Sequence, residues 1–255
     1  YKPNIALISG ISWDHINVFP TYEIYKKQFE IFVESIVEGG SITYNSDDID
    51  TKEVVANTNR SIRKFDYSLP DFNIRNGVTY LQTVEGELPL EIFGRHNLSN
   101  LMGAKWICQQ MGVDEDDFFQ AISCFKGASN RLEKLYSTNN SFIFKDFAHS
   151  PSKVKATVNA IKDQFDEYKI IACFELHTFS SLNSNFINEY KDTLSNADIP
   201  IVYFSKKTLE SKKMDNIEFS DIVKAFNNNE LIVFDDSSKF KDYLSSMNFN
   251  KSVLL

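Results

Sequence analysis

Short apolar runs alternate with helical patterns through the second half of the chain, and this alternation constrains the fold more than any other feature of the sequence. Each run suits a buried strand, and the segments between the runs are long enough for helices with one apolar face. Such alternation is typical of a doubly wound, mostly parallel sheet. We therefore expect an α/β fold. The runs cover residues 142–147, 170–174, 201–204, 231–234 and 253–255.

One strand-to-helix turn carries side chains suited to chemistry. The run Ser141–Lys145 predicts a strand, and Pro151 fits the first turn of a helix, where its missing N–H costs nothing. Asp146 and His149 lie between them, at the carboxyl end of the strand, where open α/β sheets bind ligands. The alternative is that Asp146 caps the turn and His149 is merely exposed. The helix is expected to bury Val154, Val158, Ile161 and Phe165.

The start of the chain predicts a strand–helix–strand unit. A buried strand is expected over residues 4–11 and a further strand over 42–44, with Gly39 and Gly40 ending the helix between them. The helix has one apolar face, made by Tyr22, Tyr25, Phe29, Phe32, Val33 and Ile36.

The middle of the chain is more polar. Residues 47–86 predict loops between short elements, and the alternation over 78–84 predicts an edge strand or a hairpin arm. Helices are expected over 97–111 and 114–124.

A composition break near residues 126–130 predicts a domain boundary, so we expect domains at 1–129 and 130–255.

Composition excludes several classes of protein. A net charge of −8 argues against a nucleic-acid groove, which needs clustered Lys and Arg. Three cysteines without C-x-x-C spacing favour a reducing cytosol. No apolar run approaches the roughly 20 residues that cross a bilayer. We therefore expect a cytoplasmic protein, by default a monomer, without nucleic-acid or membrane partners.

Four motifs occur in one order along the chain: Trp13–His15, Gly94–Asn100, Phe125–Glu133 and Asp146–Pro151. Together they resemble the Mur ligase family, bacterial ATP-dependent ligases that add amino acids or peptides to UDP-N-acetylmuramate. The resemblance implies the latter half of a central ATPase domain, residues 1–129, followed by a Rossmann-like C-terminal domain, residues 130–255. It also implies a reaction through an acyl phosphate, with ATP and Mg²⁺ as cofactors.

The family's phosphate-binding loop of the G-x-x-x-x-G-K-[ST] type has no counterpart here, since the sequence contains no Gly-Lys dipeptide. The chain starts just before a predicted strand and stops inside another. We therefore expect it to be the latter part of a longer enzyme and to be inactive alone.

The resemblance assigns roles to residues in the first domain. His15 would help to hold Mg²⁺, the alternative being a hydrogen-bonded structural histidine. Asn97 and Asn100 would bind adenine, with His96 nearby, although Asn97 could also cap the helix. Where some relatives carry a carbamylated lysine, this chain has Phe29, which implies that the modification is absent.

Further roles fall in the second domain. Arg131 would reach the ATP phosphates on domain closure, the alternative being a surface salt bridge. Asp146 would bind the ribose hydroxyls, and His149 would lie near the phosphates or the incoming amine. In the segment that reads the incoming amine in relatives, arginines are replaced by the candidate substrate-binding residues His177, Ser180 and Ser181.

Two subfamilies act directly on UDP-N-acetylmuramate. Phe147-Ala148 favours the ligase of peptidoglycan recycling, which attaches the L-Ala-γ-D-Glu-meso-diaminopimelate tripeptide. The alternative is the L-alanine ligase of peptidoglycan biosynthesis. A third reading, from another class, is a non-catalytic module that binds a nucleotide or a peptidoglycan fragment.

Overall fold

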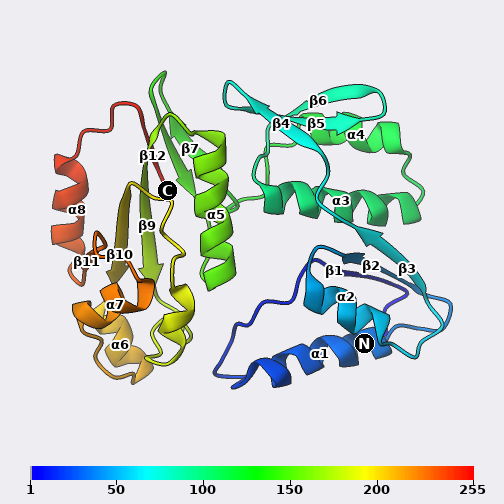
Figure 1. Cartoon of the computed structure of the whole chain (residues 1–255), viewed down its shortest axis with the longest axis horizontal. Coiled ribbons are helices and arrows are strands. Elements are labelled where there is room, and N and C mark those ends of the chain that lie inside the picture. Colours follow the sequence, from blue (N-terminus) through cyan, green and yellow to red (C-terminus); the bar gives the residue numbers. More distant parts are fainter. Residues whose placement is uncertain (1) are drawn as a thin grey trace. The chain divides into compact units, whose positions relative to one another are not determined.

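The computed structural model describes residues 2–255, which form two compact units, residues 1–126 and 127–255 (Figure 1). We call them the first and the second unit. The division falls three residues before the boundary expected from composition. None of the helices in the described residues is long and apolar enough to cross a membrane.

The first unit begins with a parallel sheet in the order β1-β2-β3. The predicted strand–helix–strand unit is confirmed, but β1 is shorter than the predicted strand over 4–11. Its side chains alternate, so that Ala6 and Ile8 are buried while Ile5 and Leu7 are each 40% exposed. The prediction of a wholly buried strand is therefore wrong, because only one face of β1 is fully packed. The elements are β1 (Ile5–Ile8), α1 (Tyr22–Glu34), β2 (Ser41–Asn45), α2 (Ile49–Ala56) and β3 (Arg63–Tyr67).

A second, antiparallel sheet completes the first unit. Its order is β4-β5-β6, so β5 is the central strand; the prediction of a hairpin arm over 78–84 is confirmed and that of an edge strand is wrong. Helix α3 contacts the parallel sheet and α4 (Figure 1). The elements are β4 (Phe72–Arg75), β5 (Val78–Thr83), β6 (Gly86–Leu90), α3 (Arg95–Gln110) and α4 (Glu115–Ser123).

Helix α3 approaches β3 closely at Gly103. A Cβ atom built on Gly103 would lie 2.9 Å from Cζ of Tyr67, whose side chain is buried. The Tyr67 hydroxyl has no hydrogen-bond partner within residues 2–255, and burial raises the pKa of Tyr67 to about 12. A residue without a side chain is therefore required where α3 crosses the ring.

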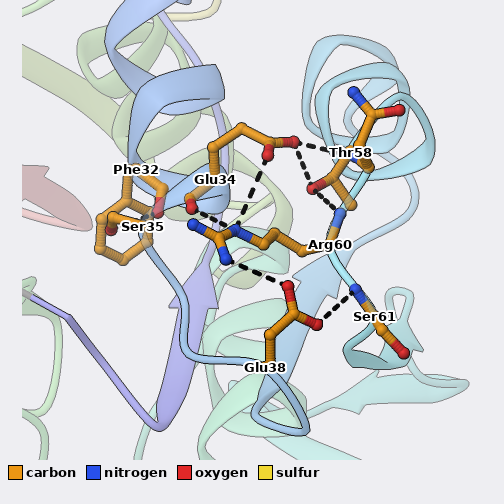
Figure 2. A network of polar contacts seen from close by, with 8 residues as sticks. Phe32, Glu34, Ser35, Glu38, Thr58, Arg60 and Ser61 are labelled. Carbon is orange, nitrogen blue, oxygen red and sulfur yellow. Dashed lines mark hydrogen bonds and ion pairs between the residues drawn. The ribbon is translucent and has the colours of Figure 1, made fainter.

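A network of polar contacts fixes the amino-terminal ends of β2 and β3 (Figure 2). The carboxylate of Glu34, at the end of α1, accepts from the hydroxyl of Thr58 at 2.6 Å, and Arg60 Nε donates to the Glu34 carbonyl at 2.7 Å. Arg60 Nη1 and the Ser61 N–H also donate to Glu38. These contacts hold the pKa of Glu34 below its usual value, mainly through the Thr58 hydroxyl. The network ties the end of α1 to the loop that follows α2.

The second unit contains a six-stranded sheet in the order β11-β10-β9-β12-β8-β7, parallel except for β7. The predicted doubly wound sheet is confirmed. The sequence did not predict β7, whose residues are mostly polar and exposed. The strands are β7 (Glu133–Ser137), β8 (Ser141–Lys145), β9 (Lys169–Leu176), β10 (Ile199–Phe204), β11 (Ile232–Phe234) and β12 (Ser252–Leu254).

Helices follow the strands of this sheet in the alternating order that the sequence predicts. The four residues expected on the apolar face of the first helix are all buried. Phe165 lies just beyond its last turn, as the C-terminal cap. The helices are α5 (Pro151–Gln164), the 3₁₀ helix η1 (Phe186–Tyr190), α6 (Lys206–Lys212), α7 (Phe219–Phe226) and α8 (Ser237–Ser246).

Candidate functional site

The loop after β1 presents His15 to solvent. The backbone of His15 is in the left-handed region, with φ of 56°, and its N–H donates to Oδ1 of the buried Asp14 at 2.7 Å. The carbonyl of His15 accepts from the N–H groups of Val18 and Phe19. The imidazole is 64% exposed, with Nε2 at 4.0 Å from Oδ2 of Asp14. A fixed, strained backbone that carries an exposed side chain is more typical of a binding residue than of a structural histidine.

The start of α3 differs from the expected capping arrangement. Gly94 is the N-cap, with φ of 91°, and Asn97 lies inside the first turn, where its Nδ2 donates to the carbonyl of Phe93 at 2.9 Å. Asn97 is therefore not the N-cap, although its amide does bind the backbone that precedes the helix. Asn100 is exposed one turn further on. Both asparagines thus lie on one face of the first turns, as the spacing predicts.

A groove of about 740 Å³ lies at the carboxyl ends of β2 and β3 and the start of α3. Asp47 shapes it by accepting from the N–H of Leu69 at 2.7 Å. His96 lines the groove, whereas Asn97 and Asn100 do not. The sequence does not predict this groove, because most of its wall comes from polar loops. The lining residues are Asn45, Asp47, Ser68, Leu69, Pro70, Asp71, Phe72, Arg95, His96 and Ser99.

Lys26 on α1 is held as a cation. Its Nζ lies 2.6 Å from Oδ1 of Asp50 and 2.8 Å from Oε2 of Glu53, and these two hydrogen bonds raise the pKa of Lys26. Carbamylation requires a neutral amine, so this lysine is a poor target. Phe29 packs edge-on against the ring of Tyr25 at 5.2 Å. This geometry argues against modification of Lys26.

In the second unit, Asp146 joins two loops. Its Oδ2 accepts from the N–H of Leu132 at 2.7 Å, and its Oδ1 accepts from the N–H of Ala148 at 2.6 Å. The first bond reaches the segment that carries Arg131. Arg131 is exposed, lies 5.8 Å over the ring of Phe147 and makes no ion pair within residues 2–255. The alternative of a surface salt bridge is therefore not supported.

Two histidines meet at the carboxyl ends of β8 and β9. The ring centroids of His149 and His177 are 6.5 Å apart. Each Nδ1 lies against a backbone carbonyl, that of Phe147 at 2.9 Å and that of Glu175 at 3.2 Å. In the neutral tautomer with its proton on Nδ1, each ring donates to its carbonyl and carries the lone pair on Nε2. The hydroxyl of Tyr190 donates to the carbonyl of His149 and fixes the backbone of this turn.

Ser180 and Ser181 are buried, whereas His177 is partly exposed. Oγ of Ser181 accepts from the N–H of Thr178 at 3.0 Å and also contacts the Thr178 hydroxyl. This arrangement is a turn within the segment after β9. Of the three candidate substrate-binding residues, His177 is the one that a ligand can reach directly, and the substrate-binding roles stay predictions.

Each unit thus places polar side chains at the carboxyl edge of its parallel strands, which defines a two-unit α/β protein with a candidate ligand site in each unit. Residues 1–108 match the family model of the Mur ligase middle domain. The chain is 31% identical, over 214 residues, to a UDP-N-acetylmuramate–L-alanine ligase of Caldicellulosiruptor bescii, an alignment that covers 79% of this chain and 47% of that protein. The chain belongs to the Mur ligase family.

Solved structures have the same fold. The UDP-N-acetylmuramate–alanine ligase of Thermotoga maritima gives a TM-score of 0.68 at 18% identity, covering 99% of this chain and 55% of that one. A murein peptide ligase of Psychrobacter arcticus gives 0.63 at 16%, covering 100% and 54%. The MurF ligase of Thermotoga maritima in complex with ADP gives 0.72 at 16%, covering 99% and 58%.

These matches confirm the predicted fold class, that of the middle and C-terminal domains of Mur ligases. The chain spans about half the length of the curated relatives it matches.

Proposed function

We propose that this chain is the ATP-binding and C-terminal portion of a ligase that joins L-alanine to UDP-N-acetylmuramate. The observation that carries the proposal is the similarity to L-alanine ligases over 79% of the chain. The pair Phe147-Ala148 taken alone favours the tripeptide ligase. The similarity to L-alanine ligases supports the L-alanine alternative better, whereas the murein peptide ligase of Psychrobacter arcticus, at 16% identity, shares the fold alone.

In the proposed reaction, a carboxylate oxygen of the sugar attacks the γ-phosphorus of ATP, and ADP leaves. The nitrogen of L-alanine then attacks the acyl carbon, inorganic phosphate leaves, and the amine gives up a proton. Phosphoryl transfer between anions depends on charge neutralisation and positioning. Arg131 suits the first role, because it is exposed and unpaired by any carboxylate within residues 2–255. His149 and His177 are proposed to accept the amine proton, each through Nε2 of the neutral tautomer whose proton is on Nδ1.

The proposal includes ATP as cofactor, supported by the ADP complex of a MurF ligase with the same fold. Asn97 and Asn100 are assigned to adenine. The Asn97 amide already donates to Phe93, which leaves its oxygen as an acceptor for the adenine N6 amino group. His96 lines the neighbouring groove and is assigned to the same nucleotide.

Mg²⁺ belongs to the proposal as well. The described residues contain no cluster of three or more His, Cys, Asp or Glu side chains that could hold a metal. Mg²⁺ prefers oxygen ligands and keeps several waters, so a single imidazole is a weak anchor and the substrate phosphates would supply the main contacts to the ion. His15 would be that ligand, and the ion would neutralise phosphate charge.

The test measures ADP release in the presence of UDP-N-acetylmuramate and ATP. It is done with this chain and with the longest translated open reading frame that contains it. L-alanine and the tripeptide are compared as amines. We expect turnover with L-alanine to exceed that with the tripeptide at least tenfold. Faster turnover with the tripeptide would restore the recycling ligase. ATP binding without turnover by either protein would favour the non-catalytic module.

A further inference from the structure

Asp146 directly follows β8, and both of its carboxylate oxygens accept from backbone N–H groups of loops. Oδ1 accepts from the N–H of Ala148, in the turn that carries His149, and Oδ2 accepts from the N–H of Leu132, next to Arg131. A third bond, from the Phe147 N–H to the Asn130 carbonyl at 2.9 Å, joins the same two loops. The two loops are therefore fixed to each other inside the second unit.

The loop that carries Arg131 needs such support. Asn130 and Leu132, on either side of Arg131, are in the left-handed region, with φ of 56° and 44°. Asparagine tolerates the left-handed region, but leucine is strained there by about 1–3 kcal/mol, and such a conformation persists only where neighbours hold it. Glu133 holds Asn130 by accepting from its N–H at 2.8 Å, and Asp146 holds Leu132. The side chain of Arg131 stays exposed while its backbone is fixed.

We propose that Asp146 is a positioning residue. It fixes the backbone beside Arg131 and beside His149, so that both side chains can bind the same polyphosphate. This inference rests on the proposed function and deepens it. It adds to the expected role of Asp146 on the ribose hydroxyls, since each carboxylate oxygen keeps a further lone pair beside the bond that it accepts from a backbone N–H group. In this role Asp146 acts on the polyphosphate through the residues that it holds.

The positioning role predicts the direction in which loss of the Asp146 charge changes the affinity for polyphosphate. Removal of a negative charge near a bound anion strengthens anion binding if the charge has no other role. Replacement of Asp146 by Asn removes that charge but also places an NH₂ group against a backbone N–H, which breaks one of the two bonds. If Asp146 positions Arg131, the Asp146→Asn variant binds polyphosphate more weakly, against the electrostatic trend.

The experiment compares three versions of the 255-residue chain: the unaltered protein, Asp146→Asn, and Asp163→Asn as a matched control. Asp163 is exposed on α5, and its substitution makes the same chemical change outside the two loops. Calorimetry measures the affinities for inorganic tripolyphosphate and for ATP. NMR measures amide exchange of Leu132 and Ala148 and the order of the Arg131 Nε–H group.

We expect Asp146→Asn to speed exchange of Leu132 or Ala148 about tenfold, the effect of losing one hydrogen bond to a charged group. Arg131 should lose order, and tripolyphosphate and ATP should both bind several-fold more weakly. Asp163→Asn should leave every quantity close to that of the unaltered chain. If Asp146→Asn unfolds the second unit, Glu133→Gln, which loosens the same loop through Asn130, replaces it with the same expected results.

Three outcomes would overturn the proposal: unchanged amide exchange, unchanged Arg131 order, or tighter binding of tripolyphosphate by Asp146→Asn. Weaker binding of ATP alone, with tripolyphosphate unaffected, would return Asp146 to the ribose. If the unaltered chain binds neither probe, the proposed function fails. The exchange and order measurements then decide the positioning role by themselves.

Discussion

Replacement of Gly103 by Ala tests how α3 is seated on β3. In a helix interior, alanine is favoured over glycine by about 1 kcal/mol, so propensity alone predicts a more stable protein. The new Cβ would lie 2.9 Å from Cζ of Tyr67 and 3.0 Å from both Cε1 and the hydroxyl oxygen. The ring is buried and cannot swing away, and overpacking of this kind costs about 1–3 kcal/mol. We expect Gly103→Ala to destabilise the first unit by about 1 kcal/mol.

Two further variants isolate the cause. Tyr67→Leu removes all three atoms that the new Cβ would meet, so in that background Gly103→Ala should stabilise by about 1 kcal/mol. Ala104 is exposed on the same helix, and Ala104→Gly measures helix propensity without the ring. Both tryptophans, Trp13 and Trp106, lie in the first unit, so tryptophan fluorescence during urea unfolding reports on that unit. A rise in stability from Gly103→Ala in the unaltered background would refute the reasoning.

Three further predictions concern the first unit. Tyr67→Phe removes a buried hydroxyl that lacks a partner within residues 2–255, so urea unfolding should show unchanged stability or a gain of up to about 1 kcal/mol. The pKa of Glu34 is lowered on folding from 4.5, so the contribution of Glu34 to the free energy of unfolding is present above pH 4.5 and is lost as pH falls through the folded-state pKa. Glu34→Gln should therefore flatten the dependence of stability on pH in this range, as measured by urea unfolding. His15→Ala should change the stability of the first unit by less than about 0.5 kcal/mol, because the imidazole is mostly exposed, yet it should abolish most ligase turnover. Comparable losses of stability and of turnover would indicate a structural histidine.

Much of the fold follows from local patterns. The strand over 141–145 and the helix behind Pro151 were predictable because an apolar run and a helix-start signal stand side by side. Helix α2 was missed because its 8 residues are too few to show a clear helical periodicity, and its start depends on Asp48, which accepts from the N–H of Thr51 as the N-cap. Strand β7 was missed because an exposed edge strand needs no apolar alternation.

The candidate site was predictable only where it is local. The turn from Asp146 to Pro151 is contiguous, and its side chains follow from its place after a strand. The bond from Leu132 to Asp146 joins a backbone N–H to a carboxylate fourteen residues away, and the residue type of Leu132 carries no signal for it. The burial of Ser181 could not be predicted from the sequence either, since serine is common both in solvent-exposed loops and in buried turns.

The position of β12 has a consequence for how the second unit is made. β8 and β9 do not pair with each other; β12 lies between them and pairs with both, Val253 opposite Phe142 and Ile170. During synthesis, β8 can pair with β7, but its other edge stays unpaired until β12 has left the ribosome. Unpaired edges favour association between chains. A premature stop a few residues before Ser252 would leave two half-sheets prone to aggregation, even though it removes none of the residues assigned to the ligand.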